Sequence, residues 1–175
     1  MEPKEISALL NTNTQDLKDF FGSQDAAFWS KELEGKWTPG QHVIHLVQSS
    51  TPLLKALKMP KFLLKWKFGK NSRATRNLDE IVEKYHTKLS ERQGLVSPFS
   101  VNMPTSEPNE RSMWFEKLTK LNEQINAQTQ KISPKDLDTI LLPHPLLGKL
   151  TLREILMWNT YHTKHHHSIL KQKYI

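Results

Sequence analysis

The sequence has 175 residues, a formal net charge of +7 and no cysteine. This length suits one domain with a substantial core, so we expect residues 1–175 to form a single domain. The lack of cysteine excludes a disulfide framework, a thiolate metal site and a cysteine nucleophile. A charged N-terminus and the absence of an uncharged apolar run of about 18 residues predict no signal peptide, no transmembrane segment and a cytoplasmic location.

Apolar residues recur with helical spacing almost throughout the chain. A first helix is expected over residues 4–21, ending at Gly22. A second helix begins sharply at Thr38, where Thr38-Pro39-Gly40-Gln41 has the pattern of a capping box. Pro52 is expected to kink or restart this helix, because proline lacks a backbone N–H and clashes with the preceding turn.

Further helices are expected over residues 77–92, with Gly94 as a stop, and over 109–131. A long proline-containing loop, 95–108, separates them. A short helix should follow Ser133. A final long helix should run from Thr151, in a second capping box, to about residue 171. Sustained period-2 alternation and hairpin turn signals are missing, so the sequence predicts no strands and an all-α fold.

The last helix carries the most informative pair of residues, His162 and His166. At 100° per residue they fall near the centre of one apolar stripe, flanked by Ile155 and Ile169. Two imidazoles four residues apart are neighbours on a helix and can reach one ion, and without cysteine, imidazole is the natural ligand. Burying both without a partner would be costly, and a metal would relieve that cost. The pattern alone leaves open a metal site, a pair of core histidines bonded to their neighbours, or a solvated histidine-rich helix end.

A third ligand must come from another helix, and the second helix offers His42 and His45. The apolar stripe of this helix places His42 at its edge and His45 further round, beside polar residues such as Ser49. The stripe alone favours His42, whereas a polar seam facing a central cavity would favour His45. The pattern leaves both alternatives open.

Two segments resemble the DinB/YfiT-like superfamily. Residues 37–46, WTPGQHVIHL, look like the start of the second helix in that family, and HPLLGKLT followed by YHTKHH, residues 144–151 and 161–166, resembles its last stretch. The resemblance implies a four-helix bundle of the up-down-down-up type with additional short helices. It also implies a metal bound by one histidine of the second helix and two of the last.

Carried over by motif position, the ligands implied by the resemblance are His45, His162 and His166. We expect Asn159, His42 and Gln41 to touch these ligands or to line the pocket around them. The resemblance further implies a divalent metal ion such as Zn, Ni or Fe, and a homodimer. It suggests a metal-dependent enzyme, either a thiol S-transferase acting with a low-molecular-weight thiol or a hydrolase, on a small-molecule substrate. Three neutral histidines leave coordination positions open, as catalytic sites do.

The positive charge is concentrated in one segment. Residues 55–76 contain eight Lys and Arg and no acidic residue, whereas the remaining 17 basic residues are nearly balanced by 18 acidic ones. Aromatic residues interleave with the lysines, so the alternative function is a non-enzymatic binding module that docks an anionic partner. The candidate patch consists of Lys61, Lys65, Lys67 and Lys70. A nucleic acid partner is not expected.

Overall fold

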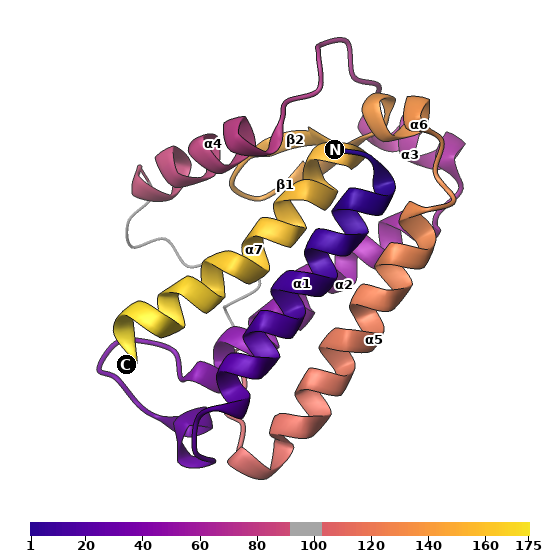
Figure 1. The fold of residues 1–175 in the computed structure, drawn as a ribbon. Coiled ribbons are helices and arrows are strands. Elements are labelled where there is room, and N and C mark those ends of the chain that lie inside the picture. Colours follow the sequence, from indigo (N-terminus) through magenta and orange to yellow (C-terminus); the bar gives the residue numbers. More distant parts are fainter. Residues whose placement is uncertain (92–102) are drawn as a thin grey trace.

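The computed structural model describes residues 1–91 and 103–175 (Figure 1). The predicted helix stop at Gly94 and most of the predicted loop over 95–108 lie outside the described residues. Within them the α-helices are α1 (Pro3–Gly22), α2 (Pro39–Lys58), α3 (Lys61–Phe68), α4 (Leu78–Ser90), α5 (Arg111–Thr129), α6 (Pro134–Thr139) and α7 (Leu152–Lys173). Short 3₁₀ helices cover Ala27–Ser30 and Pro108–Glu110.

Four long helices, α1, α2, α5 and α7, form the bundle (Figure 1). Helices α1 and α7 begin at the same end of the bundle. At that end Arg153 Nη1, near the start of α7, donates a hydrogen bond to the carbonyl of Met1, just before α1, at 2.6 Å. Helices α2 and α5 both begin at the other end, beside the two 3₁₀ turns, and they run side by side. Each pair is therefore parallel and the two pairs are antiparallel, which is the up-down-down-up order. The prediction of a helical bundle with additional short helices is confirmed.

Capping boxes define the starts of the two helices that carry the candidate site. Thr38 accepts a hydrogen bond from Gln41 N at the start of α2, and Thr151 accepts one from Glu154 N at the start of α7. The expected restart at Pro52 is wrong, since α2 runs through Pro52 to Lys58. Buried leucines beyond the proline, at 53, 54 and 57, hold the second half of the helix in the core.

A two-stranded antiparallel hairpin, β1 (Leu141–His144) and β2 (Gly148–Thr151), corrects the prediction that strands are absent. Its strands are only four residues long, and prolines interrupt the first strand and the turn, so no period-2 pattern is visible in the sequence. The turn is closed by His144, whose Nδ1 accepts hydrogen bonds from the backbone N–H groups of Leu146 and Leu147 at 3.1 and 3.0 Å. Gly148 has φ +75°, which favours glycine.

Two apolar clusters occupy the bundle, and a layer of polar side chains lies between them along the helices. One cluster includes Leu57, Ile81 and Leu152, and the other includes Phe21, Val43 and Leu170. The buried polar residues at this level include Asn13 and Thr14 of α1, His45, Ser49 and Ser50 of α2, Asn122 of α5, and Asn159, His162 and His166 of α7. A buried polar layer must be internally hydrogen-bonded or hold a ligand, because unpaired polar groups are costly.

Among the described residues, no helix combines the length and the apolar character that a membrane span requires.

Candidate metal centre

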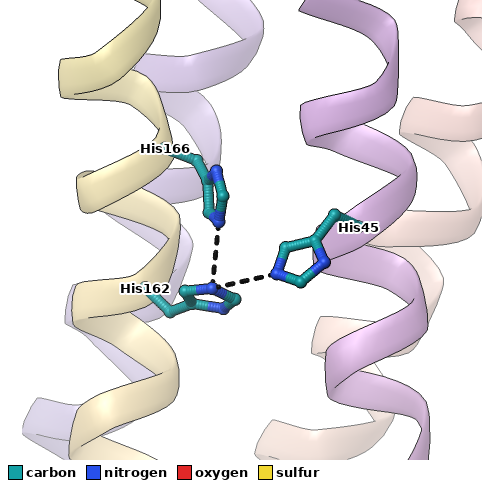
Figure 2. A group of neighbouring side chains, drawn as sticks. All are labelled: His45, His162 and His166. Carbon is teal, nitrogen blue, oxygen red and sulfur yellow. Dashed lines mark hydrogen bonds between the residues drawn. The ribbon is translucent and has the colours of Figure 1, made fainter. Parts of the chain in front are cut away.

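Three histidine rings converge inside the bundle at the level of the polar layer (Figure 2). His162 and His166 come from α7, and His45 faces them from α2. His162 Nε2 lies 3.0 Å from His166 Nε2 and 3.3 Å from His45 Nε2. One ligand nitrogen from each ring lies within 4.8 Å of the others, and all three residues are buried.

Helix geometry explains the convergence. The spacing of four residues brings His162 and His166 to one face of α7, as the sequence predicts. On α2 the polar seam faces the centre, so His45 points at His162 while Val43 packs in the apolar cluster. The alternative based on the apolar stripe favoured His42 as the third ligand. In the structure His42 instead contacts His166 on the ring nitrogen, Nδ1, that does not face His162.

Two of the three rings have a partner on their second nitrogen. His166 Nδ1 lies 2.8 Å from His42 Nδ1, and His162 Nδ1 lies 3.5 Å from Ser49 Oγ, at the long limit of a hydrogen bond. Ser49 Oγ donates its proton to the Leu46 carbonyl, so it is free to accept from His162. His45 Nδ1 is buried without a partner among the described residues. Hydrogen bonds of this kind fix the ring tautomer that leaves Nε2 available to a metal.

The donor set fits a divalent ion better than it fits a hydrogen-bonded cluster. A neutral ring nitrogen offers one proton or one lone pair, so His162 Nε2 makes one good hydrogen bond and not two. Bonds of about 2.0–2.1 Å at tetrahedral angles place ligand nitrogens about 3.3 Å apart. The observed separations of 3.0 and 3.3 Å are close to that value. Three imidazoles directed at one point could therefore hold a metal.

Burial keeps these rings neutral, which is the form that binds metal. Desolvation lowers the pKa of His45 to about 4, assisted by the charge of His165. Desolvation also brings the pKa values of His162 and His166 well below the usual 6.5, with neighbouring histidines adding to the effect. The pKa of His42 is lowered to about 3, first by burial and then by His45.

Aromatic side chains that the sequence analysis did not assign to the site enclose the rings. Trp37 lies over His45 with ring centroids 4.9 Å apart, and Trp158 stacks on His162 at 4.4 Å. The Tyr174 hydroxyl donates to the Trp37 carbonyl and so ties the end of the chain to this cover. Trp158 could have been found from the sequence, because it precedes His162 by one helical turn. The position of Tyr174 depends on tertiary packing.

Asn159 and Gln41 bond to residues other than the three histidines. Asn159 Oδ1 accepts from Ser50 Oγ at 2.8 Å, which joins α7 to α2. Asn159 also lines a cavity of about 280 Å³, together with Ser49 and Trp158. Gln41 caps α2, and its Nε2 donates to the Pro104 carbonyl at 3.3 Å.

The other histidines lie elsewhere. His165 and His86 pack with Tyr85 and Tyr161 outside the site, and His86 Nε2 lies 2.5 Å from the Tyr161 hydroxyl. His167 packs against a phenylalanine of α1. Of the four histidines of α7, His162 and His166 therefore face the candidate site, whereas His165 and His167 face other parts of the fold.

The predicted lysine patch is not in contact with the histidines. Lys61 and Lys65 are half-buried, whereas Lys67 and Lys70 are exposed. Lys65 pairs with Asp136 of α6 at 2.6 Å, and Lys61 Nζ donates to the Leu57 carbonyl at 2.8 Å. All four residues lie in or just after α3, beyond the end of α2 that is remote from His45.

Comparison with known proteins places this geometry in a family. No curated protein matches the chain. Among solved structures, the chain is similar to YfiT from Bacillus subtilis, with a TM-score of 0.63, 18% sequence identity, and coverage of 97% of this chain and 84% of that one. YfiT is described as a probable metal-dependent hydrolase with an unusual four-helix bundle topology. A family model for the DinB superfamily matches residues 9–170. The chain therefore belongs to the DinB superfamily.

Proposed function

We propose that the chain is a metal-dependent enzyme that acts on a small molecule, with one divalent ion bound by His45, His162 and His166. The observation that carries the proposal is the convergence of these buried rings, with His162 Nε2 3.0 and 3.3 Å from the other two Nε2 atoms. Their lowered pKa values support the same assignment, because neutral imidazole is the ligand form.

A divalent ion with three histidine ligands supplies a Lewis acid with open positions, and it acidifies a water molecule or thiol enough to give a nucleophile at neutral pH. The chain's own residues would prepare the site. In the tautomer that a metal needs, Ser49 and His42 would accept hydrogen bonds from Nδ1 of His162 and His166, and Trp37 and Trp158 shield the rings from water. None of the described carboxylates bonds to the three rings, so we assign no carboxylate as general base.

Hydrolysis and thiol transfer are the two reaction classes proposed. The likeness to YfiT supports a hydrolase, and the wider family supports a transferase that uses a low-molecular-weight thiol. The cavity of about 280 Å³ is lined mostly by apolar residues and is of a size for part of a small substrate. None of the three histidines lines it, but it reaches Ser49 and Trp158, which contact His162. Zn, Ni and Fe all suit a site of this kind.

The test uses the full chain loaded separately with Zn, Ni or Fe. Each form is assayed against a panel of activated esters and amides, and in thiol transfer to an electrophile. We expect turnover that chelation abolishes and metal restores, and that His162→Ala removes. His165→Gln, on the same helix but outside the site, should keep it. Turnover that survives in His162→Ala, or no turnover with any metal, would contradict the proposal.

A further inference from the structure

Helix α3 exposes two large aromatic side chains on one face. Phe62 is 70% exposed and Trp66 is 83% exposed, whereas Leu64 on the opposite face is fully buried. Residues four apart are neighbours on a helix, so the two rings form one apolar surface. Exposed tryptophan and phenylalanine side by side are unusual on a protein surface that meets only water.

Four lysines lie in or just after the same helix as this aromatic pair. We use the name α3 patch for Phe62, Trp66, Lys61, Lys65, Lys67 and Lys70. Within it, Lys65 is neutralised by Asp136. Lys67 and Lys70 are exposed, and neither has an ion pair among the described residues. Because residues 55–76 contain no acidic side chain, the patch keeps a net positive charge.

We propose that the α3 patch docks on an anionic phospholipid surface, with Phe62 and Trp66 entering the interface and the lysines contacting the headgroups. Tryptophan is suited to the boundary between water and acyl chains, and lysine stems can lie along apolar surface while their charges stay at the headgroups. In helices that lie at a membrane interface, the binding free energy from burying aromatic side chains adds to that from the attraction of lysines to anionic lipid.

A second copy of the chain is a poorer occupant. In a two-fold dimer the same patch faces itself, so the lysines of one copy would approach the lysines of the other. Single-stranded nucleic acid also combines stacking with charge, but it is usually held in a groove. The rings of Phe62 and Trp66 instead project from an exposed helix face.

The α3 patch is remote from the candidate metal centre along the fold. Helix α3 follows the end of α2, beside α6, whereas His45 lies in the first half of α2 (Figure 1). Substitutions in the patch should therefore leave the histidine site intact, and docking would position the enzyme at a surface without changing its chemistry.

The experiment is sedimentation of the full chain with vesicles of phosphatidylcholine alone or with 30 mol% phosphatidylserine. We expect binding only to the anionic vesicles, weakened by raising salt from about 50 to 500 mM because of screening. Phe62→Ser/Trp66→Ser should lower the apparent partition coefficient at least about tenfold. Lys67→Glu/Lys70→Glu should lower it by a similar factor.

Two control variants test whether a loss of vesicle binding is specific to the α3 patch or follows from any similar change of charge or apolar surface. Lys36→Glu/Lys120→Glu makes the same charge change at other exposed sites, and Ile175→Ser removes an exposed apolar side chain at the C-terminus. Both should bind vesicles as the unchanged chain does. Brominated lipid acyl chains should quench the fluorescence of the unchanged chain more than that of Trp66→Phe, because only the former has an inserted indole.

Four outcomes would overturn the proposal. The first is no binding to anionic vesicles at low salt. The second is equal binding by Phe62→Ser/Trp66→Ser. The third is a dimer, seen by light scattering, that this double substitution dissociates while vesicles stay unbound. Tighter binding to a single-stranded oligonucleotide than to vesicles would likewise assign the patch to nucleic acid.

Discussion

His42 Nδ1 lies 2.8 Å from His166 Nδ1, and both rings are buried. Burial first, and neighbouring histidines second, lower the pKa of each ring, so both are neutral at pH 7. One nitrogen of the contact must then donate and the other accept. If His166 donates, its Nε2 carries a lone pair directed at His162 and His45, which is the tautomer that a metal ligand needs.

Replacement of His42 tests this relationship. His42→Ala should weaken metal binding about 10- to 100-fold without abolishing it, because the three proposed ligands remain but His166 loses its orienting partner. His42→Asn, whose side-chain oxygen can accept the same proton, should recover part of the loss. Metal affinity measured by competition with a chromogenic chelator checks both. If His42→Ala removed metal as completely as His162→Ala does, His42 would be a ligand itself.

Gly40 lies against the indole of Trp29. A Cβ at this position would lie 2.4 Å from Trp29 Cε2, which is closer than atoms can approach. Gly40→Ala should therefore destabilise the fold by about 1–3 kcal/mol, because the buried ring must move. Gly22→Ala is the matched control, since no atom lies within 4 Å of its added Cβ. Urea unfolding of both variants checks the prediction, and equal stabilities would contradict it.

Glu154 joins the basic segment to α7. Its fully buried carboxylate accepts from Arg73 at 2.5 and 2.6 Å, from Arg76 Nε at 3.1 Å, and from the backbone N–H groups of Arg76 and Thr151, both at 2.9 Å. Burial alone would raise its pKa, but these hydrogen bonds hold the pKa below its usual value.

Glu154→Gln should lower the free energy of unfolding by about 2–3 kcal/mol. This is below the full value for breaking a buried pair, because Arg73 is partly exposed and can be solvated. Glu116→Gln, in an exposed pair with Lys120, should leave the unfolding midpoint unchanged. The two are compared by denaturant unfolding at pH 7, and a null effect of Glu154→Gln would show that the buried pair adds no stability.

His144 makes stability depend on pH. Burial, followed by the charge of Lys84, lowers its pKa from 6.5 to about 4. The unfolded chain therefore binds the proton first, and stability falls as pH drops from about 6.5 towards 4, by about 3 kcal/mol at pH 4 from this residue. His144→Asn keeps an acceptor for the backbone N–H groups of the turn but removes the titration.

The prediction is checked by unfolding the metal-free chain and the His144→Asn variant between pH 7 and 4. Both should lose stability, because other histidines are also buried, but the variant should lose less. Parallel curves for the two proteins would mean that His144 is not buried in a neutral form.

The sequence was sufficient for much of this fold because its helices carry local signals. The capping boxes at Thr38 and Thr151 mark the starts of α2 and α7 correctly, and the interior positions of His162 and His166 follow from helical periodicity alone. The hairpin was missed because its prolines and glycine hide the alternation of a strand only four residues long.

Contacts between elements that are distant in the sequence were harder to predict. The helical wheel of α2 could not decide between His42, at the edge of the apolar stripe, and His45, beside polar residues further round. The facing helix determines which ring reaches His162. The cover formed by Trp37 and Tyr174 joins residues 137 positions apart, and no local pattern reports such a contact. The restart predicted at Pro52 failed because packing of the following leucines outweighs one lost backbone hydrogen bond.

Anomalous diffraction at the zinc absorption edge, from crystals of the chain supplied with Zn²⁺, would show whether the three histidines hold an ion. We expect one strong interior peak at about 2.0–2.1 Å from Nε2 of His45, His162 and His166, in the centre of the polar layer. An interior without such a peak, or a peak held by His42 in place of His45, would contradict this expectation.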